Sequence, residues 1–302
     1  MTLLPSPRVV PSRRRRVDRQ RLPLPALILA IIAIAFFALP FIGLVWRAPW
    51  STTWEVLSDP EVRQALRLSI ECSLWATALS IVFGVPLAWL LARIDFPGRG
   101  LVRALATLSM VLPPVVGGVA LFFSFGRRGL FGQYLYDWFG FRLPFTTRGV
   151  ILAQTFVSMP FLVLTMEGAL RQLDIRYEDA ARTLGASRGY VFRRVTLPAV
   201  RPAFVAGAVL AWARALGEFG ATITFAGNFP GTTQTMPLAI YLALESNPDE
   251  ALILSMVLIG VSFAVLIGLR DRWLGGSARA QASTAPATNA GRTAGSVTRR
   301  KT

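Results

Sequence analysis

The stretch Glu178–Pro198, EDAARTLGASRGYVFRRVTLP, is a polar and basic segment between two long apolar runs. Its first part, up to Leu184, contains good helix formers and carries its acids near the start, where the helix dipole favours them. Gly185 is placed to end that helix, because glycine readily adopts the left-handed conformation of helix ends. Ser187 is then an N-cap for a second short helix, which Pro198 would stop. The pattern predicts two short helices joined by a sharp bend.

The composition of the chain indicates several membrane spans. Of its 302 residues, 53% are hydrophobic, which is too many for an ordinary soluble domain of this length. The net charge of +16 comes from arginine, since Lys301 is the only lysine. The basic residues gather at the two tails and in short loops between apolar runs. The positive-inside rule explains that distribution without nucleic acid, so we expect no nucleic-acid partner.

Several kinds of chemistry are excluded by residue type. The chain has one cysteine, Cys72, and no histidine, so it forms no internal disulfide and has no cluster with metal-ligand spacing. A Ser-His hydrolase site is excluded for the same reason. We expect no metal and no cofactor in this chain.

Six apolar runs are each close to the ~20 residues that a bilayer-spanning helix needs. The first run is longer than the core of a signal peptide and has no convincing cleavage site, so we interpret it as a retained span. We therefore expect an all-α, polytopic membrane protein of about six transmembrane helices. The runs are Leu24–Trp46, Leu68–Leu91, Ala104–Phe125, Gly149–Leu170, Ala203–Phe225 and Ala251–Leu269.

The chain is expected to divide into four parts. Residues 1–23 are rich in proline and arginine and read as a disordered basic cytoplasmic tail, followed by the first transmembrane helix at 24–46. Residues 66–270 form the membrane-embedded core. Residues 271–302 turn to Gly, Ala, Ser, Thr and Arg and are expected to be a second disordered basic tail.

The loop charges predict the orientation. The two tails, the link that carries Arg93 and Arg103, and the 178–198 segment are basic, whereas residues 226–250 contain no Lys or Arg. Six spans with both termini in the cytoplasm fit this alternation. The link between Arg127 and Arg148 carries four arginines on the predicted outer side, which counts against the assignment. We keep this orientation because the opposite one would place the 178–198 segment on the outer side of the membrane.

The fifth apolar run carries two ionisable residues, Arg214 and Glu218, near the middle of the bilayer, where charges are costly and should face protein or water. One helical stripe there also contains small and hydroxyl-bearing side chains. Two interpretations remain open: a polar translocation path, or an ion pair that locks helices or subunits together. The candidate path residues are Arg214, Gly217, Glu218, Thr222, Thr224 and Asn228.

The 178–198 segment resembles the EAA loop of ABC importer permeases, the coupling segment that docks into the ATPase. The matching pattern is an acid, two alanines, a glycine six residues after the acid, and an aliphatic-x-Leu-Pro ending. The sequence has Asp179 where the family usually has Glu, with Glu178 directly before it. The residues that the resemblance assigns to coupling are Glu178, Asp179, Ala180, Ala181, Gly185, Val195, Leu197 and Pro198.

The segment from Ala213 to Tyr241, with RALGEFGATITFAGN at its start, is similar to permeases of molybdate ABC importers within the sulfate and molybdate group. The resemblance implies a homodimeric permease in the bacterial cytoplasmic membrane. It also implies two copies of a separate ATP-binding subunit, which uses ATP and Mg²⁺, and an extracytoplasmic oxyanion-binding protein. Sulfate, thiosulfate and tungstate remain alternative substrates.

A Walker A loop needs a glycine-rich turn followed by lysine, and Lys301 lies in the tail, so ATP hydrolysis must occur on another chain. Two other classes of function remain as alternatives. A passive channel or scaffold would need no energy source. An intramembrane enzyme would use Glu71 or Glu218 as acid or base, but neither has an evident partner nucleophile or metal.

Overall fold

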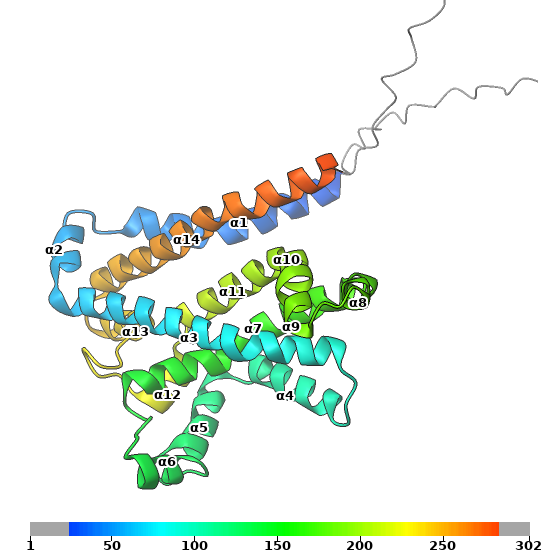
Figure 1. Ribbon diagram of the computed structural model, residues 1–302. Helices are drawn as coiled ribbons and strands as arrows, with labels where there is room; N and C mark the ends of the chain where they lie inside the picture. Colours follow the sequence, from blue (N-terminus) through cyan, green and yellow to red (C-terminus); the bar gives the residue numbers. More distant parts are fainter. Residues whose placement is uncertain (1–23, 284–302) are drawn as a thin grey trace, which may run out of the picture. The chain divides into compact units, whose positions relative to one another are not determined.

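The computed structural model describes residues 24–283, and within that range the chain forms helices and no strand (Figure 1). This confirms the all-α prediction. The chain divides into two units after Arg47. The described part of the first unit is α1 (Leu24–Arg47), which is apolar on all sides, as is typical of a membrane span.

The second unit contains the remaining helices, most of them shorter than a membrane span. Between α7 and α11, four short helical pieces form a segment that we call the elbow, residues 176–199. The helices before the elbow are α2 (Thr53–Ser58), α3 (Pro60–Arg93), α4 (Arg99–Val111), α5 (Pro114–Phe125), α6 (Gly132–Phe139) and α7 (Thr147–Gln172). The elbow and the helices after it are α8 (Arg176–Thr183), α9 (Arg188–Val191), the π-helix η1 (Phe192–Thr196), α10 (Leu197–Ala199), α11 (Arg201–Leu216), α12 (Gly220–Ala226), α13 (Met236–Ser246) and α14 (Pro248–Ser283).

The centre of the second unit is formed by α3, α7 and α11, which pack side by side (Figure 1). Helix α3 presents small residues to α7, so the two backbones approach closely, as is common in membrane helix packing. Ser80 of α3 lies 3.4 Å from Ser158 of α7 through their hydroxyl oxygens. A Cβ added to Gly207 of α11 would meet Leu162 at 3.0 Å. These contacts hold α7 between the other two helices.

Four described helices are long and apolar enough to cross a membrane: α1, α3, α7 and the first part of α14, Pro248–Val265. A fifth span results if the later part of the elbow, Arg188–Ala199, and α11, which are bent by 77°, count as one. Four of the six expected runs therefore lie within long apolar helices. The count of six spans stays a prediction.

The third expected run, Ala104–Phe125, is not a continuous helix. It divides into α4, which ends at Val111, and α5, which begins at Pro114. Pro113 has an extended ψ of 129°. Because a residue before proline is driven away from the helical region, two successive prolines end one helix and begin the next.

The prediction that the fifth run, Ala203–Phe225, forms one helix is also wrong. Helix α11 ends at Leu216, and α12 begins at Gly220. Two glycines flank Glu218, and they weaken the helix at the point where its carboxylate binds the backbone of the next helix. The single helical stripe expected through Arg214 and Phe225 is therefore interrupted.

Pro198 does not stop the second elbow helix, contrary to the sequence expectation. Pro198 lies in α10, and the chain bends two residues later, at Val200. The π-helix before it shifts the hydrogen bonding, with the Leu197 N–H donating to the Phe192 carbonyl. Proline is tolerated here because it sits in the first turn of α10, where it has no intrahelical hydrogen bond to lose.

Helix α14 continues to Ser283, beyond residue 270, where the core was expected to end. The expected tail at 1–23 and the last part of the expected C-terminal tail, 284–302, lie outside the described residues. The division of the chain at 23, 46, 66 and 270 stays a prediction.

Helices α5 and α12 touch through Gly118, and this contact generates a stability prediction. A Cβ at Gly118 would lie 2.8 Å from the Ala221 carbonyl oxygen and would also meet the Thr224 side chain. We expect Gly118→Ala to lower the unfolding free energy by about 1–3 kcal/mol, the usual cost of overpacking. Thermal unfolding of the detergent-solubilised protein measures this. Gly100→Ala, where a Cβ meets nothing within 4 Å, is the control. Equal midpoints for the two variants would contradict the close α5–α12 contact.

Candidate functional site

The elbow has the bend that the sequence predicts. Gly185 has φ +85°, the left-handed conformation expected of a helix-ending glycine. The Ser187 hydroxyl accepts a hydrogen bond of 3.3 Å from the Tyr190 N–H and caps α9. Both helix-end predictions are confirmed.

Glu178 is turned into the protein and has only 2% of its surface exposed. Its Oε1 accepts hydrogen bonds from the Arg93 guanidinium at 2.9 Å and from the Thr196 hydroxyl at 3.1 Å. Arg182 lies 3.5 Å from Oε2. We call these four residues the Glu178 cluster. It joins the end of α3, helix α8 and η1.

Arg93 also donates to the Leu173 carbonyl, at 3.2 Å, where α7 ends. A single guanidinium therefore connects α3, α7 and α8. Its side chain is only 9% exposed, so loss of the Glu178 carboxylate would leave an uncompensated buried charge. Breaking a buried pair in this way typically costs about 3–5 kcal/mol.

Asp179 touches the cluster at its most exposed member, Arg182, and its side chain is 56% exposed. Its contact within the elbow is the Arg182 guanidinium at 3.4 Å. The two neighbouring acids thus separate, one holding the elbow to the helices and one facing outward. Of the other expected coupling residues, Ala180, Gly185 and Pro198 are exposed, whereas Ala181, Val195 and Leu197 are half-buried.

A second buried carboxylate, which sequence reasoning missed, stands near the same end of α7. Glu167 accepts hydrogen bonds from Arg103 of α4 at 2.6 and 2.9 Å, and Arg171 lies 2.8 Å from the same oxygen. An acid inside the apolar run Gly149–Leu170 was the signal that could have found it. The pair ties α4 to α7.

At the break between α11 and α12, Arg214 and Glu218 form an ion pair. Their charged atoms are 2.5 Å apart, and Glu218 is fully buried while the Arg214 side chain is 27% exposed. The other Glu218 oxygen accepts a 2.8 Å hydrogen bond from the Ala221 N–H. This carboxylate therefore caps the start of α12, where the helix dipole favours a negative charge.

The remaining candidate path residues differ in whether their side-chain polar atoms have hydrogen-bond partners. The Thr224 hydroxyl donates to the Gly220 carbonyl at 2.8 Å, so it is committed to its own helix. Thr222 is fully buried, and its hydroxyl has no partner among the described residues. Asn228 likewise has an unpaired side-chain oxygen in the described part of the chain. Gly217 is exposed at the helix break.

Gln154 on α7 was not expected as a polar residue of interest. It is fully buried, and both its amide oxygen and nitrogen lack partners within residues 24–283. Buried amides are rarely left unpaired. A polar amide inside the apolar run Gly149–Leu170 was the sequence signal that could have found Gln154, as the acid was for Glu167.

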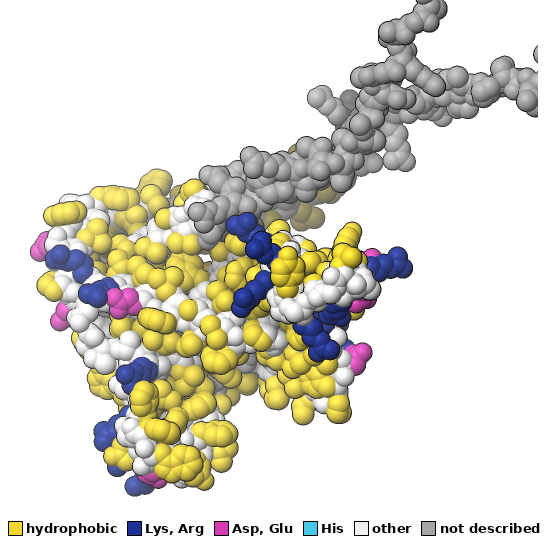
Figure 2. Space-filling view, viewed as in Figure 1, with side chains coloured by type: hydrophobic (Ala, Val, Ile, Leu, Met, Phe, Trp, Pro, Cys, Tyr) yellow, Lys and Arg dark blue, Asp and Glu magenta, His cyan; other side chains and the backbone are white. Residues whose placement is uncertain are grey.

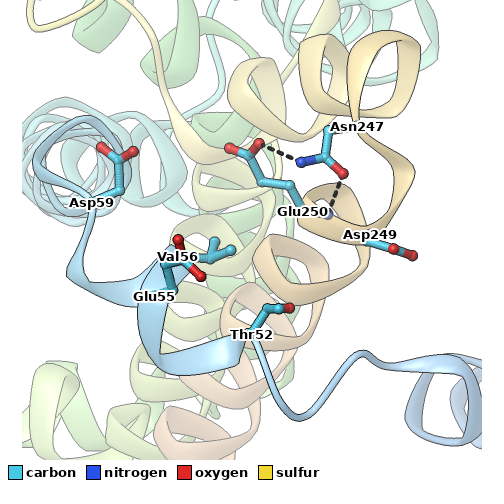
Figure 3. Close-up of a pocket in the computed structure, with 7 residues that line it drawn as sticks. All are labelled: Thr52, Glu55, Val56, Asp59, Asn247, Asp249 and Glu250. Carbon is cyan, nitrogen blue, oxygen red and sulfur yellow. Dashed lines mark hydrogen bonds between the residues drawn. The ribbon is translucent and has the colours of Figure 1, made fainter.

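A cavity of about 340 Å³ lies between α2 and the start of α14 (Figure 3). Four carboxylates line it, those of Glu55, Asp59, Asp249 and Glu250. Asn247 exchanges 3.4 Å hydrogen bonds with Glu250 and caps α14. The concentration of negative charge makes this cavity unsuited to an anion.

Figure 2 shows arginine side chains (dark blue) over the elbow and around α6, with hydrophobic side chains covering much of the face between them. The elbow and α6 lie at opposite ends of α7. Charge at two ends with an apolar band between them is the pattern expected of a protein that crosses a bilayer.

Comparison with known proteins adds a family. The family described as "Binding-protein-dependent transport system inner membrane component" matches residues 84–276. The molybdenum transport system permease protein ModB of Mycobacterium tuberculosis is 46% identical over 243 residues, which cover 80% of this chain and 92% of that protein. ModB of Escherichia coli is 44% identical over 227 residues, covering 75% of this chain and 99% of its own.

The chain is also similar to the sulfate transport system permease protein CysT of Salmonella typhimurium, at 38% identity over 221 residues, covering 73% and 79% of the two chains. Among solved structures, a bacterial ABC transporter that imports the acidic polysaccharide alginate matches with a TM-score of 0.64 and 18% identity, covering 83% of this chain and 94% of that one. The MetNI methionine ABC transporter matches with a TM-score of 0.55 and 16% identity, and the match covers 71% of this chain and 95% of that one.

The two structural matches show a shared fold, and the sequence matches extend over most of each relative. The chain therefore belongs to the family of binding-protein-dependent transport system inner membrane components.

Proposed function

We propose that this chain is the membrane-spanning permease subunit of an ATP-driven importer that moves molybdate into the cytoplasm by alternating access. The observation that carries the proposal is its identity of 44–46% with two molybdenum permeases over 92–99% of their lengths. Sulfate permeases are less similar, at 38%.

The energy for transport comes, in this proposal, from a separate ATP-binding subunit that binds ATP and Mg²⁺. The elbow offers a surface for that subunit. Tyr177, Leu184 and Tyr190 are 64%, 89% and 57% exposed, and Asp179 lies among them in the sequence. Exposed apolar side chains next to a charged group are typical of a protein-binding surface.

The Glu178 cluster supports a mechanical role for the elbow. A push on α8 reaches α3 through the Arg93–Glu178 pair and reaches α7 through the Leu173 carbonyl. Because these groups are buried and charge-paired, the elbow moves with the helix ends rather than sliding over them.

The assembly that we propose contains a second copy of this chain, two ATP-binding subunits and an extracytoplasmic oxyanion-binding protein. The elbow faces the cytoplasm, and both termini lie on the same side. The basic residues of the elbow fit a cytoplasmic location.

We place the translocation path near the break between α11 and α12. The break supplies an exposed Gly217 and the partly exposed Arg214 guanidinium. The segment after the break adds Thr222 and Asn228, whose side-chain oxygens are unpaired among the described residues. Glu218 takes a positioning role there, because its carboxylate binds Arg214 and caps α12. Thr224 is the least suited of the six candidates, since its hydroxyl bonds to the backbone.

A sulfate, thiosulfate or tungstate permease is the alternative within the same family. The 38% identity with a sulfate permease is the observation that keeps this alternative. A passive channel is the alternative from another class. Uptake into vesicles with and without the ATP-binding subunit separates it from a driven importer, because flux through a channel does not depend on ATP.

Replacing Glu178 with glutamine should destabilise the permease. The change removes the charge that compensates Arg93, and we expect a loss of about 3–5 kcal/mol. Thermal unfolding in detergent measures it, with Asp179→Asn as the matched control on the adjacent, exposed residue. If both variants unfolded at the same temperature, Glu178 would not be the buried member of the pair.

Substitution on the outward face of the elbow should instead uncouple transport. A Cβ at Gly185 meets nothing within 4 Å, so Gly185→Tyr projects outward, at a backbone cost of about 1–2 kcal/mol for its positive φ. We expect co-purification of the ATP-binding subunit, and ATPase activity stimulated by the loaded binding protein, to fall at least tenfold. Gly100→Tyr, which also has open space but lies on α4, should retain both. Intact assembly and stimulation in Gly185→Tyr would refute the docking surface.

The substrate is tested by competitive uptake of labelled molybdate into vesicles that contain the assembled transporter. We expect unlabelled molybdate at tenfold excess to suppress uptake about tenfold, whereas the same excess of sulfate leaves most of it. Tungstate is the second competitor, because it is the molybdate analogue nearest in size and charge. Strong inhibition by sulfate at equal concentration would move the assignment to a sulfate permease.

A further inference from the structure

The link between α5 and α7, residues 126–146, has an aromatic side that no described residue covers. Helix α6 places large apolar side chains at the spacing of one helical face. Phe131, Trp138 and Phe139 are 57%, 74% and 71% exposed. With their neighbours they line an apolar cavity of about 420 Å³, formed by Phe125, Phe131, Tyr134, Leu135, Trp138 and Phe139.

This link is fixed to the end of α5. The Leu130 and Phe131 N–H groups donate to the Phe123 and Ser124 carbonyls at 3.1 and 2.8 Å. A Cβ at Gly132 would lie 2.5 Å from the Phe125 carbonyl oxygen, so only glycine permits this close return of the chain. The exposed aromatic side is therefore held in place by the backbone.

The other side of α6 is basic. Arg127 and Arg142 both donate to the Tyr136 hydroxyl, at 3.2 and 3.3 Å, and both guanidinium groups lie over its ring, 4.3 and 5.2 Å from the centroid. The hydrogen bond from Arg142, together with both positive charges, lowers the pKa of Tyr136. The link contains three arginines, and a fourth, Arg148, lies in the first turn of α7, against a single acid, Asp137. Two cations thus converge on one exposed position.

We propose that the α6 link binds a phospholipid of the surrounding membrane, with the aromatic side in the boundary between headgroups and acyl chains and Arg127 and Arg142 on the phosphate. A short helix with aromatic residues on one side, and with arginines from its flanking segments gathered on the other, is suited to this boundary. Anionic lipid complements the excess of positive charge.

Lipid also explains a charge that the positive-inside rule does not. The link lies at the end of α7 opposite the elbow, where basic residues were unexpected (Figure 1). Arginines that bind headgroup phosphates have a role at either membrane surface. The inference goes beyond the proposed transport function and depends only on placement in a membrane, so either can fail without the other.

The position of α6 can be measured with spin labels on the assembled transporter in liposomes of phosphatidylcholine and phosphatidylglycerol. The one native cysteine, Cys72, is fully buried, so labels go to introduced cysteines. Trp138→Cys reports the aromatic side, and Gln133→Cys, also exposed and on α6, is the matched control. We expect the label at 138 to be accessible to oxygen and protected from a water-soluble nickel complex, with the reverse at 133.

Two outcomes would overturn the proposal. If both labels were accessible to the nickel complex, α6 would face water. If the label at 138 were protected from both oxygen and nickel, a protein would cover the aromatic side instead of lipid.

A second experiment tests whether the link selects anionic lipid. Arg127→Gln combined with Arg142→Gln should lower the affinity for phosphatidylglycerol about fivefold for each arginine, as expected for basic residues at a membrane surface. Arg67→Gln, which removes an exposed arginine elsewhere, is the control and should change nothing. Native mass spectrometry of the detergent-solubilised complex counts the bound lipid. Unchanged binding in the double variant, or displacement of the lipid by inorganic phosphate, would show that the arginines do not form a lipid site.

Discussion

The buried carboxylate of Glu178 is the constraint on which the arrangement of the elbow depends. A charge with 2% exposure is tolerated because Arg93, Arg182 and the Thr196 hydroxyl surround it. Those partners come from three different segments, so satisfying the charge fixes the segments to one another. The elbow is short and would have little stability alone, since helical pieces of three to eight residues do not persist in water without tertiary contacts.

Such a buried pair of glutamate and arginine occurs three times within residues 24–283. Glu167, Glu178 and Glu218 are buried glutamates, and each is paired with arginine. Glu167 ties α4 to α7, Glu178 ties the elbow to α3, and Glu218 bridges the broken helix between α11 and α12. Glu178 and Glu218 sit where helix ends or breaks expose polar backbone, whereas Glu167 lies within α7. Small residues and hydrophobic contacts join the helix interiors. For a transporter, such charged joints connect the parts that must move together.

Local rules were sufficient to predict the elbow, because Gly185 and Ser187 carry their conformational preferences within a few residues. They were insufficient to tell Glu178 from Asp179, since the partner that turns Glu178 inward lies 85 residues away in the sequence. The apolar runs predicted the long helices α3 and α7. They did not reveal the break at Gly217, because hydropathy continues across it. Pro113 and Pro114 are compatible with a kink within one span as well as with a break between two helices, and the structure has two helices there.

The central claim is that the elbow and the end of α3 move as one body. Spin labels at Leu184 on the elbow and at Asp95 beyond α3, both exposed, test it in the assembled transporter by the distance between them, without nucleotide and in an ATP-trapped state. The account predicts one narrow distance that is the same in both states and that broadens in Glu178→Ala. A distance that changes with nucleotide while Glu178 is intact would contradict it.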